Sequence, residues 1–331
     1  MVTPRTALVT GITGQDGSFL AELLLERGYR VTGLAREPRE RSLGSSEHLR
    51  GRIDVLGGDL LDPVGLRAAI EQVGPAEIYH LAGPSFVPDS WRDPRQTFAA
   101  IAGSAAAILQ AVRDLDPSPR VFLAASGAIF GDSPESPQRE STPPRPATPY
   151  AAAKLAAHQL AGLMREHEGL HASSGILYNH ESERRPERFV TRRISRAAAA
   201  VALGLQDRVT LGSLDAVRDW SFAGDIMHGA WLMLQQERAE DYVLASGVAR
   251  TVADLGRTAF ACVDLDFERY VEVDPELVRP SEPTPSVGDP ARARERLGWT
   301  PQLSFEQLVE RMVAADMRSL QDAARPVQGS P

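Results

Sequence analysis

The sequence predicts an α/β fold, in which a Rossmann-type doubly wound parallel sheet carries a smaller mixed α/β domain beside it. In the first half of the chain, short apolar runs alternate with longer amphipathic stretches, the pattern of buried parallel strands and their covering helices. A glycine-rich turn directly follows the first apolar run, where such a sheet binds its ligand. The second half of the chain is less regular.

The apolar runs of the first half are the expected strands of the sheet. They span residues 6–10, 30–34, 53–56, 76–81 and 120–125. We expect a helix at 18–27 and another that starts near Tyr150 in Ala-rich sequence, after a loop at 133–149 that holds six prolines. In the second half the pattern favours two helices, two short strands and a proline-rich loop. These are expected at 189–203, 225–236, 208–211, 242–245 and 275–290.

We expect these elements to form two domains. The nucleotide-binding domain comprises 1–175 and also 216–245, and the substrate-binding domain comprises 176–215 and 246–320. The polar sequence of 321–331 predicts a frayed tail.

Composition narrows the class of protein. Apolar residues make up 43% and charged residues 24% of the chain, as in globular enzymes, and a net charge of −8 argues against nucleic-acid binding. There is no apolar signal segment and no apolar run of the roughly 18 residues needed to span a membrane. Cys262 is the only cysteine, which excludes an internal disulfide and a cysteine-based zinc site. We therefore expect a cytoplasmic protein without a metal, a nucleic-acid partner or a membrane partner.

Gly11, Gly14 and Gly17 follow the first expected strand at a regular spacing. Glycines in this position permit a tight turn and let a pyrophosphate approach the N-terminus of the next helix. The turn therefore predicts a bound dinucleotide, and its spacing is typical of the extended short-chain dehydrogenases.

The end of the second strand favours NADP over NAD. NAD enzymes usually place an acidic residue there for the ribose 2′-hydroxyl, whereas Arg36 can pair with a 2′-phosphate. Glu37 follows and keeps NAD open, and the alternative interpretation of Arg36 is a solvated loop charge.

Lys154 is the only lysine among the 36 basic residues, and it follows Tyr150 by four positions. On a helix this spacing puts the phenol and the ammonium on one face. A nearby cation lowers the pKa of a tyrosine, so Tyr150 can accept a proton from a sugar hydroxyl while a hydride leaves the same carbon. Lys154 can also hold the cofactor ribose. Ser126 ends the fifth strand and can share the C4 hydroxyl with Tyr150, although it can instead bond the local backbone.

Several segments together resemble the GDP-mannose 4,6-dehydratases, over about residues 6 to 315. They are Gly11–Gly17, Gly58–Leu60, Tyr150–Lys154, Asn179–Ser182, Phe189–Arg196 and Arg218–Trp220. The segments Val278–Glu282 and Gly298–Pro301 resemble this family and also the GDP-4-keto-6-deoxymannose reductases.

The resemblance implies a tightly bound cofactor and a nucleotide-sugar pocket. Besides the three glycines, Arg36 and the Tyr150–Lys154 pair, the expected cofactor contacts are Thr13, Gln15, Asp16, Asp59, Leu60, Leu81 and Ala82. The expected substrate contacts are Ser85, Asn179, Arg193, Arg218, Arg279 and Glu282. Arg218 and Arg279 are the two expected to clamp the diphosphate.

One position departs from the dehydratase pattern. The dehydratases carry Ser or Thr, one further residue and then a catalytic Glu, where this chain has Ser126, Gly127 and Ala128. Dehydration needs a base for the C5 proton and an acid for the C6 hydroxyl, and alanine supplies neither. The run from Ser126 to Gly131 instead resembles sugar-nucleotide 4-epimerases. Glu181 and Glu135 are the candidate replacement carboxylates.

The leading prediction is therefore an NAD(P)-dependent 4-epimerase that acts by hydride transfer at C4 of a GDP-linked or other purine-nucleotide-linked hexose or heptose. The alternatives are a GDP-mannose 4,6-dehydratase, a 4-ketosugar reductase and a catalytically inactive relative. We expect a homodimer, with a tetramer as the alternative.

Overall fold

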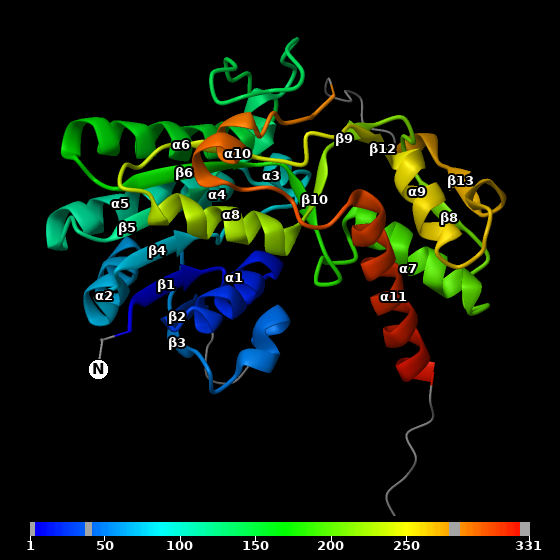
Figure 1. The fold of residues 1–331 in the computed structure, drawn as a ribbon, viewed down its shortest axis with the longest axis horizontal. Helices are drawn as coiled ribbons and strands as arrows, with labels where there is room; N and C mark the ends of the chain where they lie inside the picture. The colour runs from blue at the N-terminus through cyan, green and yellow to red at the C-terminus, as the bar shows by residue number, and fades with distance from the viewer. Residues whose placement is uncertain (1–3, 37–41, 278–284, 325–331) are drawn as a thin grey trace, which may run out of the picture.

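A seven-stranded parallel sheet forms the centre of the structure, a computed structural model that describes residues 4–36, 42–277 and 285–324 (Figure 1). The strand order is β11-β6-β5-β4-β1-β2-β3. The strands are β1 (Thr6–Thr10), β2 (Arg30–Ala35), β3 (Asp54–Gly57), β4 (Glu77–His80), β5 (Arg120–Ala124), β6 (Ala172–Leu177) and β11 (Tyr242–Leu244). The order reverses between β1 and β4, which is where a doubly wound sheet opens a crevice for its ligand. The predicted Rossmann-type sheet is confirmed.

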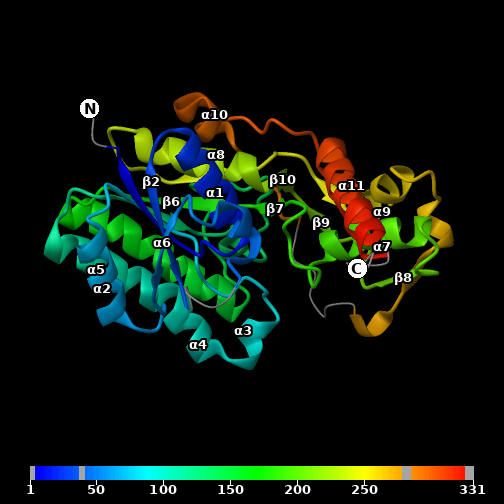
Figure 2. The same cartoon turned by 90° about the horizontal axis from the view of Figure 1, so that it is seen from below.

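Helices cover both faces of this sheet (Figure 2). On one face α1 (Gln15–Glu26) packs against α8 (Ala223–Gln235), and on the other α5 (Ser104–Leu115) packs against α2 (Pro63–Val73) and α6 (Pro149–Glu168). Alternation along β1 explains both layers, because Ala7 and Val9 join the apolar core under α1 whereas Leu8 joins the core under α2 and α5.

The apolar helix at Pro94–Leu115 comprises α4 (Pro94–Phe98), a π-helical turn (Ala99–Gly103) and α5. By length and composition it could cross a membrane. Its Ile108, Leu109 and Val112 are nevertheless fully buried between the sheet and its neighbouring helices. That burial is typical of a core helix.

The second body of the molecule consists of three helices and short strand pairs (Figures 1 and 2). Its helices are α7 (Val190–Ala202), α9 (Val252–Ala261) and α11 (Phe305–Ala324), which pack on one another. The remaining elements are β7 (Asn179–Glu181) with β10 (Trp220–Phe222), β9 (Val217–Arg218) with β12 (Arg250–Thr251), β8 (Val209–Leu211) with β13 (Val271–Val273), α3 (Asp89–Arg92) and α10 (Ala291–Leu297). The exact boundaries of the two expected domains stay a prediction.

The structure departs from the expected elements at both ends of the chain. α1 begins at Gln15, three residues before the expected start, because the end of the glycine-rich turn is also the first turn of the helix. α11 continues through Ala324, so the prediction of a frayed tail from residue 321 is wrong for 321–324. The periodicity of α9 and α11 was missed, although Leu308, Met312 and Val313 form a buried helical stripe.

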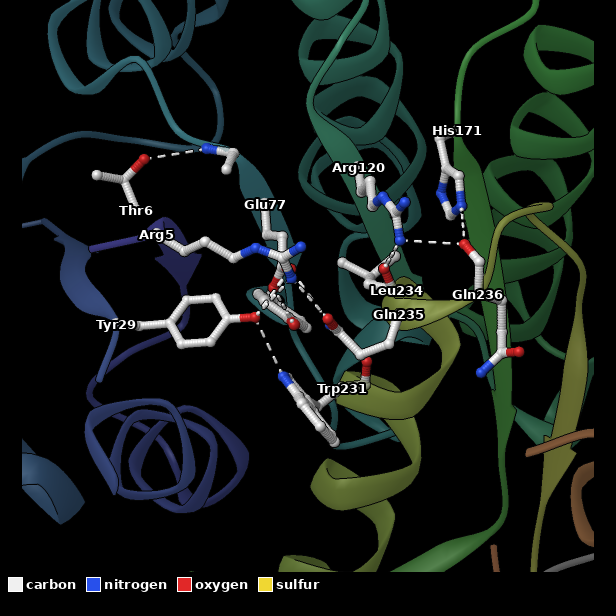
Figure 3. A network of polar contacts seen from close by, with 12 residues as sticks. Arg5, Thr6, Tyr29, Glu77, Arg120, His171, Trp231, Leu234, Gln235 and Gln236 are labelled. Atoms are coloured by element: carbon white, nitrogen blue, oxygen red, sulfur yellow. Dashed lines mark hydrogen bonds and ion pairs between the residues drawn. The ribbon is translucent and has the colours of Figure 1, made fainter. Parts of the chain in front are cut away.

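A buried carboxylate ties the amino end of the sheet to α8 (Figure 3). Glu77 is 1% exposed and accepts hydrogen bonds from the hydroxyls of Tyr29 at 3.0 Å and Tyr79 at 2.7 Å. Gln235 of α8 donates to the same carboxylate at 3.2 Å, and Arg5 contacts it at 3.4 Å. The cluster joins β1, β2, β4 and α8 through one buried side chain.

Replacing Glu77 with Ala is expected to lower the free energy of unfolding by about 2–4 kcal/mol, because two tyrosine hydroxyls lose their acceptor in a buried place. Denaturant unfolding measures the loss, with the exposed Glu71→Ala on α2 as the matched control. Equal stability of the two variants would show that the cluster does not stabilise the fold.

Candidate active site

The glycine-rich turn is packed so closely that side chains are excluded from it. Gly11 has a φ of +78°, and a Cβ there would lie 2.9 Å from the backbone nitrogen of Ala82. A Cβ on Gly17 would lie 2.3 Å from the carbonyl oxygen of Gly11. At Gly14, by contrast, a Cβ would meet only the Gly11 oxygen at 3.4 Å, and α1 starts there without a side-chain cap. The turn therefore leaves an open approach to the helix N-terminus, which fits a pyrophosphate.

The other expected cofactor residues lie at the ends of neighbouring strands. Arg36 directly follows β2 and is exposed, and Glu37 lies outside the described residues. Asp59 follows β3 and accepts a hydrogen bond from the backbone of Leu61 at 3.0 Å, and Leu60 packs on the adjoining core. The carboxyl ends of β1, β2, β3 and β4 thus meet at one edge, although the individual cofactor contacts stay a prediction.

The glycine-rich turn is bound to the segment that contains β7. The Gln15 amide donates to the His180 carbonyl at 3.1 Å, and Ser182 donates from its hydroxyl to the Gln15 side-chain oxygen at 2.7 Å. The His180 Nε2 lies 2.9 Å from the Asp16 carboxylate. We call these contacts among Gln15, Asp16, His180 and Ser182 the loop clasp. The two motifs singled out by the resemblance are therefore one physical unit.

Hydrogen bonding requires His180 to be charged. Its Nδ1 lies 2.7 Å from the Tyr178 carbonyl, and its Nε2 faces the Asp16 carboxylate. Both partners only accept, so both ring nitrogens carry protons. Burial alone raises the pKa of Asp16, but the His180 cation and its hydrogen bond hold that pKa at about 2. Burial opposes the charge on His180, but Asp16 raises the pKa of its imidazole above the ordinary value.

The three predicted catalytic residues come together where β5 ends and α6 begins. Ser126 follows β5, accepts the Ala128 backbone N–H at 3.2 Å and hydrogen-bonds to the Tyr150 side chain. Lys154 lies one turn after Tyr150 on α6, with its Nζ 5.8 Å from the centre of the phenol ring. It donates to the carbonyl of Ala124 at 2.6 Å. These contacts place a hydroxyl, a phenol and an ammonium at the carboxyl edge of the sheet.

The electrostatics of this group differ from the sequence expectation. Burial raises the pKa of Tyr150, and the Ser126 hydrogen bond and the charge of Arg185 oppose that rise. Burial lowers the pKa of Lys154 to about 8, while the Asp16 charge opposes the fall. The ammonium is directed at Ala124, so Arg185 is the cation that acts on the phenol in this arrangement.

Arg185 and His180 are the site residues that sequence reasoning missed. Arg185 places its Nε 3.1 Å from the Glu181 carboxylate and stacks its guanidinium 3.6 Å from the Phe189 ring centre. Both missed residues lie in or just after the segment Asn179–Ser182, which the resemblance had already marked. Their charges in that marked segment were the available signal.

Neither candidate replacement for the missing carboxylate has a described contact with Ser126 or Tyr150. Glu181 is 2% exposed and is occupied by Thr191, which donates to it at 2.6 Å, and by Arg185. Glu135 lies on the proline-rich loop in a half-exposed ion pair with Arg139, at 3.7 Å. The prediction that alanine stands where dehydratases have a base is thus not offset by these two groups.

The expected substrate residues are distributed over both bodies of the molecule. Ser85 is exposed in the loop after β4, Asn179 starts β7, and Arg218 in β9 pairs with Arg250 in β12. Arg193 is exposed on α7 and lines a cavity of about 420 Å³. Arg279 and Glu282 lie outside the described residues. Convergence of this set on one ligand stays a prediction.

The fold, the glycine-rich turn and the Ser126–Tyr150–Lys154 group define an NAD(P)-dependent sugar-nucleotide enzyme of the short-chain dehydrogenase/reductase superfamily. The sequence profile of the GDP-mannose 4,6 dehydratase family matches residues 8–312, and the chain belongs to that family.

Named relatives agree with this assignment. The chain is 43% identical to GDP-mannose 4,6 dehydratase 1 of Arabidopsis thaliana, over 96% of this chain and 91% of the relative. It is 38% identical to GDP-mannose 4,6-dehydratase of Yersinia enterocolitica, over 97% and 96%. Among solved structures, the Thermus thermophilus UDP-glucose 4-epimerase complex with NAD gives a TM-score of 0.82 at 27% identity, over 94% and 98%. Pseudomonas aeruginosa RMD complexed with NADPH gives a TM-score of 0.81 at 24% identity, over 95% and 99%, and supports the fold.

Replacing Lys154 with Arg is expected to lower turnover about 100-fold or more, because a planar, permanently charged guanidinium cannot reproduce the buried ammonium beside Ala124. Initial rates with the nucleotide-sugar substrate measure the effect, with unfolding midpoints confirming that the variant is folded. Undiminished turnover would contradict the catalytic role of this residue.

The loop clasp is expected to make stability depend on pH. The pKa of His180 is raised in the fold, so its contribution is complete below the ordinary value of 6.5 and is lost as pH rises through the folded pKa. The pKa of Asp16 is lowered to about 2, so its contribution is complete above 3.8 and is lost as pH falls through about 2. Unfolding free energies measured from about pH 6 to 9 should therefore fall more in the native chain than in His180→Gln. Parallel curves, or a different result with Asp16→Asn, would rule out the charged pair as the cause.

Proposed function

We propose that the chain oxidises C4 of a GDP-linked hexose with a tightly bound NADP, and that the overall reaction is the 4,6-dehydration of GDP-mannose. The Ser126–Tyr150–Lys154 group at the end of β5 carries the first part of the proposal. The names of the relatives, which match this chain over nearly its full length, support GDP-mannose and dehydration. They support the dehydratase alternative better than the 4-epimerase prediction.

The residues of the site account for oxidation at C4. The glycine-rich turn and the N-terminus of α1 hold the pyrophosphate, and Arg36 pairs with the 2′-phosphate of NADP. The nicotinamide, when bound, supplies the hydride acceptor. Ser126 and Tyr150 bind the C4 hydroxyl, and the phenol side chain takes its proton as tyrosinate. Lys154 binds the cofactor ribose, and Arg185 favours the tyrosinate by its positive charge.

The cofactor preference rests on one side chain. Arg36 occupies the end of β2, where an acidic residue would favour NAD. Both cofactors occur among the structural neighbours, since the Thermus epimerase is complexed with NAD and the Pseudomonas protein with NADPH. NADP is therefore the proposal and NAD its alternative.

A second candidate function is 4-epimerisation, and Ala128 is the observation that favours it. Once C4 is a ketone, loss of water across C5 and C6 still needs a base for the C5 proton and an acid for the C6 hydroxyl. Neither Glu181 nor Glu135 has a described contact with the catalytic group. Epimerisation needs only removal and return of hydrogen at C4, for which Ser126, Tyr150 and Lys154 suffice.

The remaining expectations complete the proposal. The protein is proposed to be cytoplasmic and to form a homodimer, with a tetramer as the alternative. A 4-ketosugar reductase is the third activity, and it differs from the other two because it consumes added NADPH stoichiometrically.

Purified chain incubated with GDP-mannose is expected to give a product that has lost one water, detected by mass spectrometry, and Tyr150→Phe is expected to give none. An isomer of unchanged mass would replace the dehydratase with the epimerase. The Ala128→Glu variant provides the matched test, because it restores a carboxylate and should raise water loss about tenfold or more. Turnover of a 4-ketosugar with added NADPH and none of GDP-mannose would overturn both candidates in favour of the reductase.

A further inference from the structure

A stack of aromatic and guanidinium groups connects the loop after β4 with the segment after β7. The rings of Phe86 and Phe189 meet edge to face, with centres 5.6 Å apart and an interplanar angle of 89°. The Arg188 guanidinium lies 4.8 Å from the Phe86 ring centre and donates to Asp89 at 3.2 Å. The loop that carries Phe86 and the segment that carries Phe189 are therefore joined, although the two residues lie about a hundred positions apart in sequence.

The inner end of this stack is Arg185. Its guanidinium lies 3.6 Å from the Phe189 ring centre, on a side chain that is only 16% exposed. The Nε atom is buried and makes no aligned hydrogen bond, although it lies 3.1 Å from the Glu181 carboxylate. An ion pair without an aligned hydrogen bond does not fix the plane of a guanidinium, whereas stacking on a ring does. Phe189 therefore sets the plane of Arg185.

We propose that Phe86 is a positioning residue for the catalytic site, because it holds Phe189 in the orientation that keeps the Arg185 guanidinium directed toward Tyr150. The proposal rests on the assignment of Tyr150 as the acid–base group. Phe86 belongs to the nucleotide-binding body and Arg185 to the segment beyond β7. The contact therefore makes the electrostatics of the phenol depend on the fit between these two parts.

Five groups surround the phenol or act on it from neighbouring elements. They are Ser126 at the end of β5, Asp16 on α1, His180 and Arg185 after β6, and Lys154 on the same helix. Asp16 is neutralised by its contact with His180, and Lys154 is directed at the Ala124 carbonyl. Arg185 is therefore the cation whose displacement changes the tyrosine most, and loss of its charge raises the pKa of Tyr150.

The test is the titration of Tyr150 in the folded chain with its cofactor, which needs no substrate. Incorporated 3-fluorotyrosine is followed by fluorine NMR, and Tyr150→Phe identifies the signal. Phe86→Ala is expected to raise the pKa of this phenol by about half a unit to one unit. Phe86→Tyr keeps the ring edge and is expected to restore the native value. The matched control Phe98→Ala removes a phenylalanine that is 41% exposed on α4 and is expected to leave the titration unchanged.

A double-variant cycle separates positioning from a general structural effect. Arg185→Gln is expected to raise the pKa of Tyr150 by itself, and adding Phe86→Ala on that background is expected to add nothing. An unchanged titration in Phe86→Ala, or an equal shift in the presence and absence of Arg185, would overturn the proposal. With an active substrate in hand, Phe86→Ala should turn over about three to ten times more slowly at neutral pH and recover at alkaline pH. Loss of turnover by the same factor at every pH would also count against it. Absence of any turnover by the native chain would overturn the proposed function and leave the titration result standing.

Discussion

The loop clasp between the glycine-rich turn and β7 is the contact on which the arrangement of the site depends. It joins Gln15 and Asp16, which begin α1, to His180 and Ser182, more than 160 positions later in the chain. Two charged groups are taken out of water there, which is unfavourable unless each finds a partner of good geometry. The doubly hydrogen-bonded imidazolium satisfies this condition. The clasp consequently fixes the position of the segment that carries Arg185, and with it the charge beside the phenol.

Buried carboxylates with full sets of donors occur elsewhere on the substrate side as well. Asp219 is 0% exposed and accepts hydrogen bonds from the backbones of Ser246 at 2.8 Å, Gly247 at 2.8 Å and Gly288 at 3.3 Å. It therefore ties three separate segments together next to Arg218. Asp316 is also 0% exposed, and Arg192 joins it by a bidentate contact that links α7 to α11. Such groups hold loops in a single arrangement because any displacement would leave a buried charge without its donors.

Local patterns predicted the features that depend on local physics. The glycine spacing predicted the turn, the apolar runs predicted the parallel strands, and the four-residue spacing predicted that Tyr150 and Lys154 share a helix face. Contacts between distant segments leave no periodic signal, so the pairing of Asp16 with His180 and the direction of the Lys154 ammonium could not be predicted. The pKa of Tyr150 could not be predicted for the same reason, since it depends on burial and on Arg185.

The functional prediction illustrates the weight of one residue against a whole chain. Ala128 led to the 4-epimerase prediction, because a single missing carboxylate removes a necessary acid–base group. Identity of 43% over nearly the full length of a GDP-mannose 4,6 dehydratase supports the alternative better. The two activities share their first step, which is the removal of hydrogen from C4 by the same three residues. They differ only in where that hydrogen is returned.

The fate of a deuterium atom placed at C4 of GDP-mannose tests this shared step most directly. If the Ser126–Tyr150–Lys154 group removes hydrogen from C4 as hydride, deuterium is retained in the product, at C6 after loss of water or at C4 after epimerisation. Mass spectrometry and NMR of the product locate it. Release of the deuterium into solvent would show that C4 loses a proton instead, and would contradict the account of the site.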